Sequence, residues 1–152
     1  MNIKKYTLAT LAGGFAMFVA ASLYMQLEAQ FFGMEIYSRP LFYGMDEMNP
    51  MVFMGFFLLL KLFHAALLSY LHEKIPRCGS GLWSKVWRFT GFAWVLMFGV
   101  GLLMTLLSMP VPPLLVASWA LGGLVQTFAG ALAIIPIVYK FPAPDASCSI
   151  GK

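Results

Sequence analysis

The stretch PMVFMGFFLLLKLFHAALLSY, residues 50–70, decides the fold class of this chain. Its one charged residue, Lys61, stands inside an apolar run that matches the roughly 20 residues a helix needs to cross a bilayer. Asn49 followed by Pro50 is typical of a helix start, because asparagine caps free amide groups and proline suits the first helical position. We therefore predict a membrane-spanning helix over 50–70.

Three more apolar runs reach the same length, at 6–25, 83–108 and 113–139. They lack the alternation of membrane-barrel strands, and only helices or closed barrels satisfy their backbone groups in lipid. The composition agrees, with 61% hydrophobic residues, a mean hydropathy of +0.81 and 11% charged residues, where soluble domains carry about 25%. We predict an all-α polytopic membrane protein: a single domain, residues 1–152, with four transmembrane helices in an antiparallel bundle.

Positive charges are distributed unevenly about these four spans. Of the ten Lys and Arg residues, Arg39 falls on one side, Lys61 lies within a span, and the remaining residues fall on the other side. Those on the other side are Lys4, Lys5, Lys74, Arg77, Lys85, Arg88, Lys140 and Lys152. Cytoplasmic segments carry the excess of Lys and Arg, so we predict that both termini face the cytoplasm. The clustering of these charges at span ends argues against a nucleic-acid partner.

Residues 26–49 form an outer loop in this scheme, and 140–152 form a short cytoplasmic tail. The loop is too aromatic for a segment in water. Its rings include Phe31, Phe32, Tyr37, Phe42 and Tyr43. We predict that they lie in the outer membrane interface or against a partner. Lys4 and Lys5 before the first apolar run also fit a signal peptide, but the run is longer than a usual signal core, so we expect a retained helix.

Small residues indicate which helices pack together, because helices in lipid associate through close van der Waals contact. In the first helix they are Ala9, Gly13, Ala16 and Ala20. In the fourth they are Ser118, Gly122, Ala129 and Ala133, with Gln126 in the same stripe. Both sets follow the spacing of a bundle seam. We predict that these two helices pack tightly and that the Ser118 hydroxyl bonds across the contact.

Lys61 is the most unusual residue, because a charge at the bilayer centre costs at least about 2.5–3.5 kcal/mol. Gln126 and Thr127 lie at a similar depth on the fourth helix, and no carboxylate does. Three interpretations stay open: a hydrogen-bond network inside the bundle, a contact with an acidic or anionic group of another subunit, or a transport or proton-relay role. Lys61, His64 and His72 share one stripe of the helix, and we predict that this stripe contacts a partner or a bound ligand.

Two sets of residues are candidate cofactor ligands, although the sequence requires no cofactor. His64 is a candidate axial ligand of haem or a chlorophyll-type pigment. The only other histidine, His72, lies two turns along the same helix, which argues against two-histidine ligation within one chain. Four methionines spaced three residues apart offer soft thioethers to Cu(I) or, alternatively, fill an interface. They are Met45, Met48, Met51 and Met54.

No motif of a known enzyme class is present: there is no Gly-x-Ser-x-Gly, His-Glu-x-x-His, P-loop or Gly-x-Gly-x-x-Gly. The two cysteines, Cys78 and Cys148, are too far apart for a Cys-x-x-Cys site. We therefore expect no enzyme, and our leading hypothesis is a non-catalytic accessory or assembly subunit of a larger membrane complex. Its partners are then lipid and other integral membrane subunits. A small oligomeric transporter or channel is the alternative, and a haem-, chlorophyll-type- or Cu(I)-binding membrane protein is the second alternative.

The segments TLATLAGG (7–14) and FAGA (128–131), with Tyr24 near the end of the first run, resemble a group of small uncharacterised bacterial four-helix membrane proteins, classed as a domain of unknown function. The resemblance covers mainly the first and last helices. Where that group's pattern has glycines late in the first helix, this chain has Ala20 and Ala21. The resemblance implies a protein of the bacterial inner (cytoplasmic) membrane and adds no activity.

Overall fold

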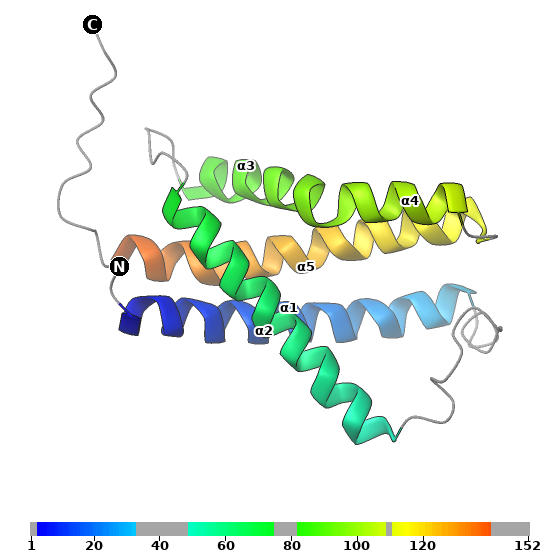
Figure 1. The fold of residues 1–152 in the computed structure, drawn as a ribbon, viewed down its shortest axis with the longest axis horizontal. Helices are drawn as coiled ribbons and strands as arrows, with labels where there is room; N and C mark the ends of the chain where they lie inside the picture. The colour runs from blue at the N-terminus through cyan, green and yellow to red at the C-terminus, as the bar shows by residue number, and fades with distance from the viewer. Residues whose placement is uncertain (1–2, 33–48, 75–81, 109–110, 141–152) are drawn as a thin grey trace, which may run out of the picture.

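The computed structural model describes residues 3–32, 49–74, 82–108 and 111–140, and this part of the chain is helical (Figure 1). The elements are α1 (Ile3–Phe32), α2 (Pro50–Lys74), α3 (Leu82–Trp94), the π-helical turn η3 (Val95–Gly99), α4 (Val100–Ser108) and α5 (Pro113–Lys140). α3, η3 and α4 follow one another without a break and form the third long helix. Within the described residues, four helices are long and apolar enough to cross a membrane, as the sequence predicted.

Two helices begin at the predicted residues, Pro50 and Pro113. The Asn49 side chain accepts a hydrogen bond from the Met51 amide at 2.9 Å, and its carbonyl accepts one from the Phe53 amide at 3.0 Å. The Pro112 carbonyl accepts the Leu115 amide at 2.9 Å at the start of α5. These contacts satisfy amide groups that have no partner within the helix itself. Both helices therefore begin where local sequence chemistry places them.

The predicted end of the first helix is wrong. α1 continues to Phe32, so residues 26–32 belong to the helix and not to the loop predicted over 26–49. The apolar run ends at residue 25, but the segment 26–32 contains neither glycine nor proline and is rich in good helix formers. The rest of the predicted loop, 33–48, lies outside the described residues.

α5 packs against α1 and against the third long helix, and α2 crosses α1 at a steep angle in the view of Figure 1. α1 packs most extensively against α5 and next against α2, whereas α2 meets α5 over a shorter length. The Pro50 end of α2 leans away from the other helices. As a result, much of the Pro50 half of α2 exposes apolar side chains such as Met51 and Phe56.

Close packing of α1 against α5, predicted from their small residues, is confirmed. A Cβ atom on Gly130 would lie 2.7 Å from Met17 Cγ, and one on Gly13 would lie 2.6 Å from Ile134 Cγ1. Each glycine therefore receives a large side chain of the other helix. The contact includes Gly130 and Ile134, which were not predicted, because the missing Cβ of Gly130 gives Met17 room that an alanine would fill.

Tyrosine hydroxyls tie α1 to both neighbouring helices. Tyr6 donates a hydrogen bond to the Ala66 carbonyl on α2 at 2.8 Å. Tyr24 donates to the Ser118 carbonyl on α5 at 2.8 Å, and its hydroxyl lies 3.0 Å from the Ser118 hydroxyl. The predicted hydrogen bond of Ser118 across the helix contact is thus present. In a medium without water, such bonds satisfy groups that would otherwise be costly to bury.

Candidate functional site

The second long helix carries a buried lysine near its middle. Lys61 is 4% exposed, and its Nζ donates a hydrogen bond to Gln126 Oε1 of α5 at 2.5 Å. The same Nζ lies 4.6 Å from the ring centroid of Phe57, one turn away on α2. The bond to Gln126 is the contact that the bundle-network interpretation requires. Thr127, predicted at similar depth, instead donates to the Gly123 carbonyl of its own helix at 2.7 Å.

The amine of Lys61 has more hydrogen-bonding capacity than this environment uses. A lysine ammonium has three N–H donors, and within the described residues Gln126 is its one hydrogen-bond acceptor. The acceptor is a neutral amide, so it cannot balance a full charge. Every acid in the sequence lies near a helix end or outside the described helices: Glu28, Glu35, Asp46, Glu47, Glu73 and Asp145. The described helices therefore offer Lys61 no carboxylate at its own depth.

His64 lies one turn further along α2, among aromatic rings. Its ring centroid is 6.5 Å from that of Phe63 and 6.1 Å from that of Phe98 in the third long helix. Its Nδ1 atom is buried and has no hydrogen-bond partner within the described part of the chain. A buried imidazole nitrogen without a partner is costly, so this atom is a second place where a ligand or another subunit can supply a hydrogen bond.

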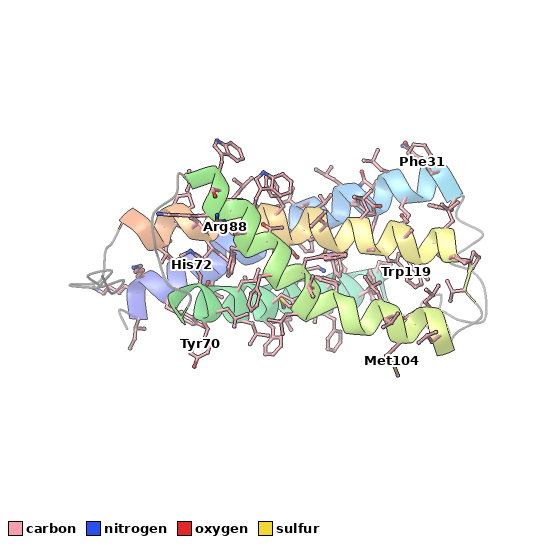
Figure 2. The ribbon with its side chains drawn as sticks, turned by 90° about the horizontal axis from the view of Figure 1, so that it is seen from above. Phe31, Tyr70, His72, Arg88, Met104 and Trp119 are labelled. Carbon is pink, nitrogen blue, oxygen red and sulfur yellow. The ribbon has the colours of Figure 1, made fainter. Side chains whose placement is uncertain are left out.

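His72, the third member of the predicted stripe, is also buried within the chain. It is 5% exposed and packs edge-on against Phe89 of α3, with ring centroids 5.2 Å apart. Figure 2 shows His72 toward the same end of the molecule as Tyr70 and Arg88. The stripe therefore brings together Lys61 and His64 near mid-span, while His72 belongs to a separate contact with α3.

The π-helical turn η3 lies beside this pair and was not predicted. Phe98, which belongs to this turn, contacts the His64 ring and lies over Gly123 of α5, where a Cβ would be 3.0 Å from Phe98 Cδ1. Just before the turn, Trp94 Nε1 donates to the Ala120 carbonyl at 2.9 Å. Single π turns in α-helices occur frequently at functional sites. The candidate site thus combines Lys61, His64 and Gln126 with the rings of Phe57 and Phe98.

No family model, curated protein or solved structure matches this chain. The resemblance to small bacterial membrane proteins, carried by the first and last helices, therefore stays a prediction. The chemistry of the site has to be inferred from its own geometry. A buried amine with spare donors, a buried imidazole nitrogen and flanking rings are suited to hold a carboxylate or another hydrogen-bond acceptor.

The remaining predicted site residues are scattered or lie outside the described part. Phe31 is 84% exposed at the end of α1, and Phe32 beside it is half-buried. Met51 and Met54 are exposed on α2. Tyr37, Phe42, Tyr43, Met45 and Met48 lie outside the described residues. Among the described residues no group of three or more His, Cys, Asp or Glu side chains is arranged to hold a metal ion. The contact of the aromatic residues of 26–49 with the membrane interface or a partner stays a prediction, and so does the Cu(I) site.

Proposed function

We propose that this chain is a non-catalytic accessory or assembly subunit of a larger complex in the bacterial inner membrane. In this proposal its four long helices form an antiparallel bundle with both termini at the cytoplasmic face, and its partners are other integral membrane subunits. The observation that carries the proposal is the environment of Lys61: a buried amine near mid-span whose one hydrogen-bond acceptor in the described structure is the neutral Gln126 side chain.

A transmembrane helix with a carboxylate at mid-depth would complete this environment. Such a group supplies both the opposite charge and the acceptors that the Lys61 ammonium lacks, and intramembrane charges commonly pair in this way. Since Lys61 is 4% exposed, the carboxylate reaches its Nζ only after a neighbouring side chain moves. Phe57 and Gln126, both only half-buried, are the side chains we expect to move.

Lys61→Met tests the proposal, because methionine keeps the length and apolar contacts of the lysine and removes its amine. After purification in mild detergent, we expect the variant to be membrane-inserted at wild-type level but to lose its co-purifying subunits by about tenfold or more, as for other close charge pairs at interfaces. Leu60→Met, an exposed neighbour on the same helix, is the matched control and should keep them. Recovery of partners with Lys61→Met at wild-type yield would rule out this role.

A small oligomeric transporter is the second candidate, favoured by further buried polar groups on α2. Ser69 and His72 follow Lys61 toward one end of the span and are also buried. The fully buried apolar side chains of Ala65 and Leu68 lie between them, which interrupts a polar path through one chain. Purification distinguishes the two candidates: a symmetric oligomer without other subunits favours transport, and stoichiometric subunits favour the accessory role. A visible-light chromophore or bound copper would instead favour the His64 or methionine alternatives.

The proposed topology predicts where tags are accessible. Tags at either terminus or near Arg77 should be cytoplasmic, and a tag near Arg39 should be external, because eight of the ten Lys and Arg residues fall on the side of the termini. The measurement is protease digestion of intact spheroplasts followed by detection of each tag. An Arg39 tag that survives external protease until the membrane is permeabilised would contradict this orientation.

A further inference from the structure

One face of α2 is buried along one half of the helix and exposed along the other. The buried half carries residues at helical spacing: Lys61, Ala65, Leu68 and His72. Met54 lies in line with them, seven residues before Lys61, yet its side chain is 42% exposed. Phe57, between the two, is half-buried. This face is therefore open from Met54 to Phe57, and we call this part, with Lys61 at its deep end, the open stretch of α2.

The opposite face of α2 is exposed along the whole helix. Its exposed residues include Val52, Phe56, Leu59, Phe63 and Tyr70. Uniform exposure of mostly apolar side chains fits contact with lipid along the whole span. The open stretch differs, because it continues a surface that packs inside the molecule. Lys61 bonds to Gln126 of α5, and the Phe57 ring lies 5.8 Å from that of Phe18 on α1. The open stretch is thus an inward-facing surface that the described helices leave uncovered where the Pro50 half of α2 diverges from them (Figure 1).

Lys61 at the deep end decides what can cover the open stretch. It lies about 16 Å along the helix axis from Pro50, where α2 begins. Lipid tails offer its amine no hydrogen-bond acceptor at this depth, because lipid oxygens lie in the headgroup region. A protein segment that reaches Lys61 has to satisfy its own backbone groups in the membrane interior, which an α-helix does within itself. A spanning helix is therefore the occupant that fits both the apolar and the charged part of the open stretch.

We propose that the open stretch is the docking surface for the transmembrane helix of a partner subunit that carries a carboxylate. This inference rests on the proposed accessory role and adds where the partner lies. The partner helix packs along Met54 and Phe57, and its carboxylate lies about 10 Å deeper than its contact with Met54, level with Lys61. Methionine suits such a surface, because its flexible side chain adapts to the shape of a partner. Phe57 lies between Met54 and Lys61 and is the side chain that the partner displaces.

Photocross-linking in intact membranes tests the proposal, with p-benzoyl-phenylalanine placed at position 54 in one variant and at position 56 in another. Position 56 is the matched control, because Phe56 is exposed at nearly the same depth and points to the opposite side of the helix. We expect position 54 to cross-link to another integral membrane subunit and position 56 to lipid. Adding Lys61→Met to the position 54 variant should lower the cross-linked product by about tenfold, because the charge pair that holds the partner helix is lost.

Failure of the docking surface and failure of the accessory role give different results. If Lys61→Met loses its co-purifying subunits but these cross-link from position 56, or from both positions equally, the role stands and the docking surface is overturned. Cross-links from position 54 to lipid alone, to a second copy or to another part of the same chain also overturn the docking surface. If Lys61→Met keeps its subunits at wild-type yield, the accessory role itself fails. Membrane insertion of both photoprobe variants at wild-type level shows that a missing cross-link reports geometry and not misfolding.

Discussion

Replacing Gly14 by valine should destabilise the protein severely, because this glycine lies where α1 crosses α2. Gly14 is buried, and a Cβ on it would lie 2.6 Å from Leu62 Cδ2 and 3.0 Å from the Leu62 Cα. A flexible side chain can move aside, but a Cα atom moves only with its helix. Overpacking typically costs about 1–3 kcal/mol, and a branched side chain against backbone belongs at the upper end. We expect the melting temperature in detergent to fall by roughly 5–10 °C.

Gly55→Val on α2 is the matched control for this prediction. A Cβ on Gly55 would meet no atom within 4 Å, so the same substitution adds a side chain that faces the surroundings. Its effect should stay within about 0.5–1 kcal/mol, the range of helix propensities. Fluorescence-detected size-exclusion after heating measures both variants. Equal melting temperatures for the two valine variants would show that α1 and α2 do not meet at Gly14.

Features that depend on local chemistry could be predicted from the sequence. The start of α2 follows from the Asn49 cap, and the four long helices follow from the lengths of their apolar runs. The bond between Lys61 and Gln126 could be anticipated as one alternative, because spanning helices share one thickness and residues at equal depth can meet. Tyr24 was noted only as part of a resemblance, although it bonds to Ser118.

Features that depend on how helices fit together could not be predicted. The π turn at Val95–Gly99 contains no proline or other local signal, and Phe98 within it contacts His64 and Gly123 on two other helices. The steep angle of α2 likewise follows from contacts such as Gly14 against Leu62, which depend on the rotation of both helices. Small-residue spacing indicated which helices pack. It did not indicate the pairing of Gly130 with Met17, because that pairing depends on how the surfaces of α1 and α5 fit together.

Gln126→Leu should be the second strongly destabilising substitution, because it removes the one hydrogen-bond acceptor that the described structure offers to Lys61. The amine then stays buried beside the Phe57 ring, with no oxygen to accept its protons. Leaving a buried donor without its acceptor costs about 1–3 kcal/mol, and more for a charged group. Lys61→Met alone should be neutral or stabilising, since a methionine in this place needs no partner and the Gln126 amide left behind is neutral and half-buried.

The double variant Lys61→Met/Gln126→Leu separates the two contributions. If the loss in Gln126→Leu comes from the unpaired amine, removing that amine should restore the melting temperature to near the wild-type value, and the cycle should show a coupling of about 0.5–3 kcal/mol. A double variant as unstable as Gln126→Leu would instead assign the loss to the packing of Gln126 itself. The result also decides how Lys61→Met is interpreted in co-purification. Because that variant should be at least as stable as the wild type in isolation, a loss of its partner subunits would report recognition by the Lys61 amine and not unfolding of the chain.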